Sequence, residues 1–407
     1  MKKVSLSVKI FIGLAIGVLL GLMISPTAAT TYIKPLGTLF LNLIKMIIVP
    51  LVLSSLVVGS ASTGDVGKLG RIGIKTLAYY LVTTALAVIL GLFLANILNP
   101  GFGLSIPVDA TAEAKEIPSV VDTLLNIIPT NPIQAMADAN MLQIIVFALF
   151  LGVAITLIGE KGKPFHAFFV SMAEVCYNIV GIIMEFAPVG VFGLITPVVA
   201  EHGATALLPL LKVIIAVYLG CIIHALVVYS GTVYLSARMS PLTFFKGAAP
   251  AMMLAFTTSS SSGTLPVTMK CAEENLGVPK SIGSFVLPLG ATINMDGTAL
   301  YQGVCALFVA QVYGIDLSFA QQLTIVLTAT LASIGTAGVP GAGLIMLTMV
   351  LQTVGLPLEG TLLIGGIDRI LDMARTCINI TGDLSASILV ASTEGELNEP
   401  AEKSIST

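Results

Sequence analysis

The residues best suited to chemistry lie in the last long apolar run of the 407-residue chain, residues 362–390. It holds Asp368, Asp372, Arg375, Thr376, Asn379 and Asp383 among its polar residues. At about 100° per residue in an α-helix, all of them fall within an arc of roughly 100°. The spacing therefore predicts a single helix with a continuous polar face.

A polar face inside an apolar run needs partners. Each ionised side chain at the centre of a bilayer costs about 2.5–3.5 kcal/mol, so the face should point into a helical bundle. One explanation is purely structural, because Asp372 and Arg375 at i and i+3 can neutralise one another. Three aspartates against one or two arginines leave negative charge over, which indicates that cations bind there.

A second polar cluster lies in residues 291–302, ATINMDGTALYQ. It places Asn294, Asp296 and Thr298 in an apolar stretch that we expect Gly297 to break. Hard cations such as Na⁺ prefer carboxylate, amide, hydroxyl and carbonyl oxygens, and a broken helix leaves carbonyl oxygens free. A simple helix kink would explain Gly297 but not Asp296.

Two further apolar runs are interrupted by small and polar residues. Residues 253–269 read MLAFTTSSSSGTLPVTM, and residues 329–347 read ATLASIGTAGVPGAGLIML. They match in outline when aligned on their prolines, and the flanking charges predict that they enter the membrane from opposite sides. Such matching interruptions are typical of a transporter site near the bilayer midplane. The alternative is a flexible Gly/Ser linker, which would not be embedded between apolar runs.

The composition is that of a helical membrane protein. Apolar residues make up 56% of the chain and charged residues 10%, against about 25% charged in soluble domains. Lysines and arginines before the first span and between the second and third predict a cytoplasmic N-terminus. The sequence has no block of basic residues that would indicate nucleic-acid binding. The first apolar run leads into further spans rather than into a soluble domain, so we expect a retained helix and not a cleaved signal peptide. The five cysteines and three histidines show no metal-binding or disulfide pattern.

These motifs resemble those of the dicarboxylate/amino acid:cation symporter family, which includes archaeal aspartate transporters and animal excitatory amino acid transporters. The resemblance runs over nearly the whole chain, through LIKMIIVPLV (43–52), SSSSGTLP (259–266), NMDGT (294–298), GTAGVPGAG (335–343) and DMARTCINITGD (372–383). It implies a secondary active symporter, not an enzyme, that imports aspartate and/or glutamate by sodium co-transport. Na⁺ is then a coupling ion, and no cofactor is expected.

The resemblance also implies the architecture: an all-α polytopic membrane protein with eight transmembrane helices and two re-entrant helical hairpins as inverted repeats. It implies an elevator-type homotrimer in the lipid of the cell membrane, with both termini cytoplasmic. The implied division is scaffold helices 1–2 in residues 1–72, helix 3 of the transport domain in 73–98, an external loop with scaffold helices 4–5 in 99–204, the rest of the transport domain in 205–392, and a cytoplasmic tail in 393–407.

Site residues follow from the resemblance by position. Arg375 would bind the substrate's side-chain carboxylate and Asp372 its α-amino group. The other substrate-binding positions, around the α-carboxylate and at the hairpin tips, are Asn379, Thr376, Thr298, Ser260, Ser261, Gly338 and Val339. The sodium positions are Asn294, Asp296, Tyr80, Thr83 and Thr84 for one site, Asn379 and Asp383 for a second, and carbonyl groups around Thr292, Ser333, Ile334 and Thr336 for a third, together with Gly290.

Some positions depart from particular relatives. Ser259 stands where archaeal members have an arginine, and Met373 stands where animal members have one. This chain instead has Arg369, one turn before Asp372, and the sequence leaves its role open. Gln302 replaces a glutamate that is linked to proton and potassium handling in animal relatives, so that coupling is not expected.

Two other classes of protein fit part of the pattern. An intramembrane aspartyl protease would use Asp296 with Asp372 or Asp383 as a dyad, but it needs neither interrupted segments nor a buried arginine. An ion channel could line a pore with the same polar faces, but it could not concentrate a solute. Within the symporter family, the alternative to sodium coupling is proton coupling. The amide and hydroxyl groups of the first sodium set favour sodium over the proton.

Overall fold

The computed structural model describes residues 6–61, 68–104, 128–138, 140–203, 207–333, 336, 338 and 341–398, and every regular element in those residues is helical. The prediction of an all-α fold is confirmed. The elements are α1 (Leu6–Gly21), α2 (Pro26–Ala28), η1 (Ala29–Ile33), α3 (Lys34–Ala61), α4 (Lys68–Leu98), α6 (Pro132–Ala137), α7 (Met141–Leu157), η2 (Gly159–Gly162), α8 (Lys163–Glu185), α9 (Ala187–His202), α10 (Leu207–His224), η4 (Ala225–Tyr229), α11 (Ser230–Ala237), α12 (Pro241–Thr258), α13 (Ser261–Lys270), η5 (Cys271–Asn275), α14 (Lys280–Ile293), α15 (Asp296–Val312), α16 (Phe319–Ser333), α17 (Ala342–Thr353), α18 (Gly360–Gly365) and α19 (Asp368–Thr393).

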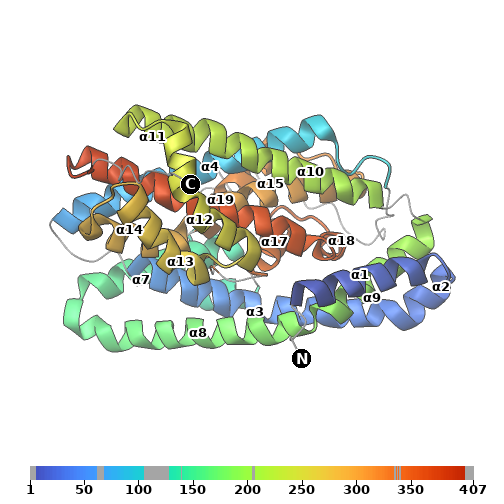
Figure 1. Ribbon diagram of the computed structural model, residues 1–407. Helices are drawn as coiled ribbons and strands as arrows, with labels where there is room; N and C mark the ends of the chain where they lie inside the picture. The colour runs from blue at the N-terminus through green and yellow to red at the C-terminus, as the bar shows by residue number, and fades with distance from the viewer. Residues whose placement is uncertain are drawn as a thin grey trace, which may run out of the picture.

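One layer of helices runs along the lower side of Figure 1. In it α1 packs along α9, and α3 lies against α7, α8 and α9. Glycines permit the close approach of α1 and α9, because a Cβ atom added at Gly13 or Gly17 would overlap Pro188 or Ile195. Small residues at helix contacts are typical of membrane proteins, in which van der Waals packing holds helices together.

The remaining long helices form a second layer around α15 and α19. α15 packs against α4 and α10, while α19 lies against α12, α14 and α15. Every residue of α15 except Gln311 is buried, and α19 is buried along most of its length. The polar face predicted on α19 therefore lies in the interior of this layer.

Two pairs of helices fold back on themselves within the second layer. In the first pair α12 ends at Thr258, Ser259 turns the chain with a left-handed φ of 52°, and Ser260 caps α13 by accepting a hydrogen bond from Gly263 N at 3.0 Å. The serine run thus supplies both the turn and the cap. The second pair consists of α16 and α17, and α17 begins after Gly341, whose φ of 86° favours glycine.

The turns of these two helix pairs touch each other. The carbonyl of Gly338 accepts hydrogen bonds from Ser260 Oγ at 3.0 Å and from Ser262 N at 3.2 Å. The interrupted segments that look alike in sequence therefore meet in space.

The break between α14 and α15 lies earlier than predicted. α14 ends at Ile293 and α15 begins at Asp296, so the interruption is at Asn294 and Met295, and the prediction of a break at Gly297 is wrong. Gly297 lies in the first turn of α15, where an added Cβ would overlap the backbone of Arg375. This glycine permits close packing of α15 on α19 rather than a kink.

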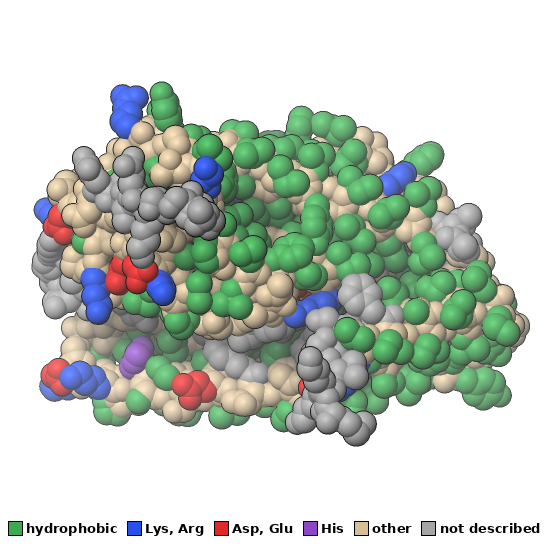
Figure 2. Space-filling model, in the orientation of Figure 1, with side chains coloured by type: hydrophobic (Ala, Val, Ile, Leu, Met, Phe, Trp, Pro, Cys, Tyr) green, Lys and Arg blue, Asp and Glu red, His purple; other side chains and the backbone are tan. Residues whose placement is uncertain are grey.

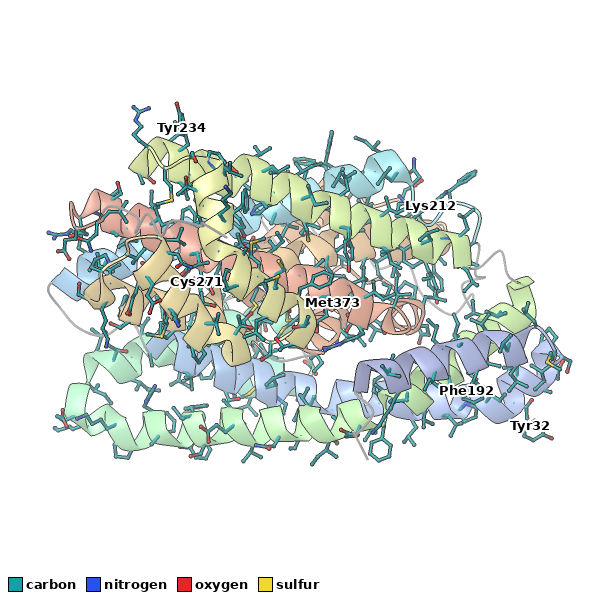
Figure 3. The ribbon with its side chains drawn as sticks, in the orientation of Figure 1. Tyr32, Phe192, Lys212, Tyr234, Cys271 and Met373 are labelled. Carbon is teal, nitrogen blue, oxygen red and sulfur yellow. The ribbon has the colours of Figure 1, made fainter. Side chains whose placement is uncertain are left out.

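Long apolar helices and an apolar surface mark this as a membrane protein. Three helices among the described residues are long and apolar enough to cross a bilayer, namely Arg71–Leu98, Gly159–Ile183 and Leu207–Ala237. Hydrophobic side chains cover most of the face in Figure 2, and most of its charged side chains gather at the end near α11 and α14. In Figure 3, Tyr32 marks the opposite end, whereas Tyr234 lies on α11.

Candidate functional site

Arg375 is the centre of the polar face of α19, and its side chain is fully buried. Its Nη1 donates to Asp368 Oδ1 at 2.9 Å, and its Nη2 lies 2.8 Å from Asp372 Oδ1. The guanidinium carbon lies 4.1 Å from the centre of the Tyr301 ring. Two carboxylates and one aromatic face thus stabilise a charge that is otherwise costly to bury. The pairing of Asp372 with Arg375 considered from the sequence is present, and Asp368 is a second partner.

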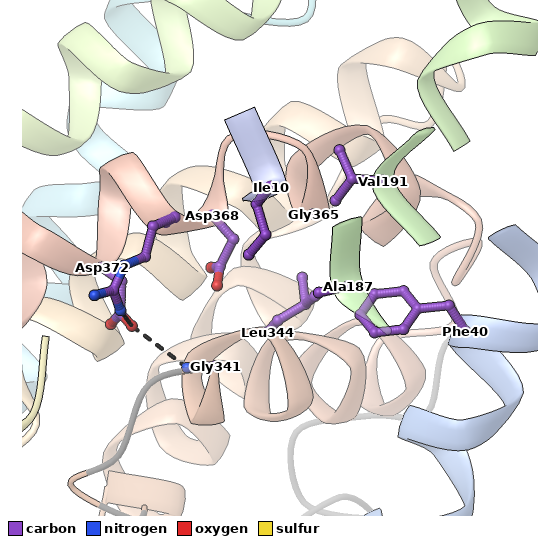
Figure 4. A pocket seen from close by; sticks show the side chains of 10 residues that line it. Ile10, Phe40, Ala187, Val191, Gly341, Leu344, Gly365, Asp368 and Asp372 are labelled. Carbon is purple, nitrogen blue, oxygen red and sulfur yellow. Dashed lines mark hydrogen bonds and ion pairs between the residues drawn. The ribbon is translucent and has the colours of Figure 1, made fainter. Parts of the chain in front are cut away.

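Asp372 links α19 to the turn of the second helix pair. Its Oδ2 accepts a long hydrogen bond of 3.4 Å from Gly341 N (Figure 4), and Thr376 Oγ1 donates to its Oδ1 at 3.4 Å. Arg369 Nη1 lies 4.0 Å from Asp372 Oδ2, and Nη2 of Arg369 donates to the carbonyl of Thr258 at 3.2 Å. Arg369 therefore bridges Asp372 and the end of α12.

A cavity of about 10 Å³ lies where the two helix pairs meet α15 and α19. Its walls contain most of the predicted substrate-binding residues: Ser261, Thr298, Gly338, Asp372, Thr376 and Asn379. Asn379 is held in place because its Oδ1 accepts from Gly297 N at 2.8 Å. Ser260 lies at the meeting turns described above, and Val339 lies outside the described residues.

A second cavity, of about 20 Å³, lies between the two layers (Figure 4). Ile10, Phe40, Ala187 and Val191 line it from one layer, and the other layer contributes Gly341, Leu344, Gly365, Asp368, Arg369 and Asp372. Asp372 thus contributes to the walls of both cavities.

The first set of predicted sodium ligands surrounds Asp296, which is fully buried. Thr84 Oγ1 donates to Asp296 Oδ1 at 2.6 Å. The hydroxyl of Thr83 donates to the carbonyl of Tyr80 at 3.2 Å, and the hydroxyl of Tyr80 donates to the carbonyl of Val286 at 3.2 Å. Thr84 therefore contacts Asp296 directly, whereas the Tyr80 and Thr83 hydroxyls bond to backbone oxygens.

The second set lies beside the first, because Asn294 joins the two. Asn294 Nδ2 donates to Asp383 Oδ1 and to the carbonyl of Asn379, both at 3.0 Å, while its Oδ1 is buried without a hydrogen-bond partner. A Cβ atom added at Gly290 would overlap both Asp383 and the Tyr80 hydroxyl, so Gly290 packs directly on them. An oxygen that is buried and unpaired next to a carboxylate fits a cation ligand.

Within the described residues, neither buried carboxylate of these sets has a lysine or arginine to balance its charge. Among the described residues, Asp296 and Asp383 form no ion pair with lysine or arginine, in contrast to Asp368 and Asp372. Oxygen ligands with uncompensated negative charge in an apolar interior are suited to a hard cation.

The third predicted set is less completely described. The hydroxyls of Ser333 and Thr336 donate to backbone carbonyls of α16 at 2.7 and 2.8 Å, and that of Thr292 donates to the Leu289 carbonyl at 3.0 Å. Thr336 also lines the 10 Å³ cavity. Ile334 lies outside the described residues.

Two residues of the site were not predicted from the sequence. His224 Nε2 lies 3.2 Å from Asp296 Oδ2, and Tyr229 OH donates to the same oxygen at 2.8 Å. The available signal was His224 itself, because an ionisable residue inside an apolar span is a candidate functional group. The spacing patterns of metal ligands do not detect a hydrogen bond between a histidine and an aspartate far away in the sequence.

Comparisons with known proteins identify the family of this chain. A model of the Sodium:dicarboxylate symporter family matches residues 6–393. The chain belongs to the sodium:dicarboxylate symporter family. It is 42% identical over 418 residues to the proton/sodium-glutamate symport protein of Geobacillus stearothermophilus, covering 99% of this chain and 98% of the relative.

Other members of the sodium:dicarboxylate symporter family match over similar lengths. The proton/glutamate-aspartate symporter of Escherichia coli is 39% identical, covering 96% of this chain and 93% of the relative. An excitatory amino acid transporter of Caenorhabditis elegans is 36% identical, covering 94% and 85%. Membership makes the protein a transporter and not an enzyme, which removes the aspartyl protease alternative.

Proposed function

We propose that this protein imports aspartate and/or glutamate by secondary active symport driven by sodium. The observation that carries this proposal is the fully buried Arg375, whose Nε has no hydrogen-bond partner and whose Nη2 pairs with Asp372, a residue that lines the cavity walled by both helix pairs. An amino acid with an acidic side chain complements this pair, because the guanidinium can hold the side-chain carboxylate with two hydrogen bonds while Asp372 binds the ammonium group. A neutral side chain would leave the arginine without that partner.

The amino acid's own carboxylate would be bound at the meeting turns. Asn379, Thr376 and Thr298 supply amide and hydroxyl groups on the side of α15 and α19, and Ser260, Ser261 and Gly338 lie where the two helix pairs meet. Val339 is proposed from the sequence alone. The cavity of about 10 Å³ has room for about one water, so a dicarboxylic amino acid can enter only if the turns separate. The two hydrogen bonds on the Gly338 carbonyl are the contacts that must break.

The coupling cation would be sodium at the sets around Asp296 and Asp383. Sodium is favoured over a proton because the sets combine two carboxylates that pair with no lysine or arginine of the described chain with the unpaired Oδ1 of Asn294 and nearby hydroxyls and carbonyls. Proton coupling is the alternative, and relatives named for either cation exist. A proton needs one basic atom, whereas Na⁺ needs several oxygens around one point.

The architecture proposed for this function is an elevator. The layer of α4 and α10–α19, which holds all described site residues, would be the transport domain, and the layer of α1, α3 and α7–α9 would be the trimer scaffold. The helix pairs α12–α13 and α16–α17 would be re-entrant hairpins among eight transmembrane helices, with both termini on the cytoplasmic side of the cell membrane.

Uptake of radiolabelled aspartate and glutamate into proteoliposomes tests this function. With sodium and proton gradients imposed separately, accumulation should follow the inward sodium gradient and persist when the proton gradient is collapsed. Asp296→Asn should lose uptake, whereas Asp316→Asn, at an exposed loop aspartate, should retain it. Accumulation driven by the proton gradient alone would establish the proton-coupled alternative, and equilibration without accumulation would indicate a channel.

A further inference from the structure

The helix formed by α10 and α11 contains one π-helical turn, η4, at the level of Asp296. In this turn Ser230 N donates to the carbonyl of Ala225, five residues earlier. π turns are rare and are found frequently at functional sites. In an uninterrupted α-helix, side chains five residues apart point about 140° away from each other at 100° per residue. The π turn removes this divergence for His224 and Tyr229.

Both side chains reach one atom of α15. Tyr229 OH donates to Asp296 Oδ2 at 2.8 Å, and His224 Nε2 lies 3.2 Å from the same oxygen. The two rings also touch edge to face, with centroids 4.9 Å apart. Without the extra residue of the π turn, only one of them could reach Asp296. The turn therefore places two groups on one carboxylate oxygen.

The hydrogen-bonding role of His224 follows from its surroundings. The side chain is fully buried, and its Nδ1 has no hydrogen-bond partner. A neutral imidazole with its hydrogen on Nδ1 would bury an unsatisfied donor and would point the lone pair of Nε2 at a carboxylate oxygen. With the hydrogen on Nε2, His224 donates to Asp296 instead. His224 and Tyr229 are thus both donors to Oδ2.

These donors fix the orientation of Asp296. Oδ2 is held by α10 and η4, and Oδ1 accepts from Thr84 at 2.6 Å on α4, where Tyr80 and Thr83 also lie. We propose that His224 and Tyr229 are positioning residues for the coupling cation, and that the π turn exists to present Asp296 Oδ1 to it. This rests on the sodium site of the proposed function. Partners that orient a metal ligand typically change metal affinity about 10–100-fold.

The test is thermal unfolding of the purified full-length protein in increasing NaCl, with choline replacing sodium and no amino acid present. His224→Leu removes the donor, while His224→Gln keeps an N–H donor at a similar reach. We expect His224→Leu and Tyr229→Phe each to raise the half-maximal sodium concentration about tenfold or more, and His224→Gln to restore it towards the wild-type value. His166→Leu, in α8 of the other layer, is the matched control and should leave sodium dependence unchanged.

A second readout separates positioning from a general structural role. Aspartate affinity at saturating sodium should stay close to the wild-type value in all variants, because the amino acid site is not altered. If His224→Leu does not fold, Tyr229→Phe, which removes a single oxygen, decides the question. Unchanged sodium dependence in Tyr229→Phe and in any folded His224→Leu, or equal loss in the Gln and Leu variants, overturns the inference. Absence of any sodium effect on the wild-type protein overturns the sodium-coupled function itself, and the inference with it.

Discussion

Arg375 would have two tasks under the proposed function, because the guanidinium assigned to the substrate also neutralises two buried aspartates. Asp368 holds Nη1, and Asp372 lies against Nη2. A substrate carboxylate that approaches Arg375 brings a third negative group, which its own ammonium can balance at Asp372. The charges therefore match a zwitterion with an acidic side chain better than they match a plain dicarboxylate.

Arg375→Cys separates these two tasks. We expect aspartate binding to weaken by about 2–5 kcal/mol, the value of a lost buried charge pair, and small neutral amino acids such as serine, alanine or cysteine to gain relative to aspartate. Sodium dependence should persist, because no proposed cation ligand is changed. Competition by unlabelled amino acids against labelled substrate in proteoliposomes measures this ranking.

The Arg375→Cys variant also leaves Asp368 without its partner, which can destabilise the fold. Arg375→Cys combined with Asp368→Asn removes that unpaired charge and is the matched control for stability. A continued preference for aspartate in the folded double variant would mean that Arg369 or another group reads the substrate side chain.

Asp372→Asn tests the proposed ammonium partner. The substitution keeps the size of the side chain but removes the charge, so amino acid binding should be lost while the protein remains folded. Calorimetric titration with aspartate at saturating sodium measures the effect, and Asp316→Asn is the control for an exposed aspartate. Wild-type affinity in Asp372→Asn would remove this residue from the site.

At this scale the sequence predicted the site residues where their chemistry was conspicuous. Charged groups in an apolar run have few alternatives to a shared interior, so the cluster on α19 and that around Asp296 could be recognised from residue type and spacing. Tyr229 could not, and neither could its convergence with His224 on one carboxylate, because a π turn changes which residues share a helix face and leaves no mark in an α-helical periodicity. Gly297 was misread because a glycine for close packing and a glycine for a kink look identical in sequence.

The helix pairs are the elements whose turns meet beside the candidate site. Both interruptions were predicted from Ser, Gly and Pro residues within apolar runs. The contact between the two turns through the Gly338 carbonyl could not be predicted, because residue spacing does not show which turns meet in space. Among the described residues, two hydrogen bonds from the serine segment hold the turns together, each worth about 0.5–1.5 kcal/mol net. Such a contact is weak enough to open in the proposed transport cycle.

Gly338→Ala should disturb this closure. A Cβ atom at Gly338 would lie 2.8 Å from both the Ala291 carbonyl oxygen and Ser262 Oγ, so the turns must move apart. We expect aspartate affinity to fall by about tenfold or more, since 1.4 kcal/mol corresponds to a factor of ten, while stabilisation by sodium alone is retained. Gly231→Ala, where the added Cβ meets nothing within 4 Å, is the matched control. Unchanged aspartate affinity in Gly338→Ala would show that the turns do not close on substrate.

At the scale of the whole molecule, α4 and the end of α19 are joined by charge as well as by packing. Arg71, near the start of α4, donates from Nη2 to Glu394 Oε2 at 2.6 Å, and Lys75 donates to Glu394 Oε1 at 2.6 Å. Glu394 follows directly after α19, so residues more than 300 positions apart are connected where α4 begins and α19 ends. Positive residues near α4 were used in the sequence only to predict membrane orientation, and their acidic partner could not be identified without the fold.

This cluster predicts how stability depends on pH. Hydrogen bonds from Arg71 and then Lys75 lower the pKa of Glu394 from its ordinary 4.5 to about 2. Because the folded pKa lies below the unfolded one, the ionised carboxylate stabilises the fold above pH 4.5, and this stabilisation is lost as the pH falls from there towards 2. Wild-type protein should therefore melt at a higher temperature than Glu394→Gln at neutral pH, and the difference should shrink as the pH is lowered through this window. Added salt should reduce the difference as well, because the cluster lies near solvent.

Glu174→Gln, at an exposed position on α8, provides the control and should show no such trend. A difference between wild-type and Glu394→Gln that stays constant down to pH 3 would show that the ion pairs do not hold α4 to the end of α19.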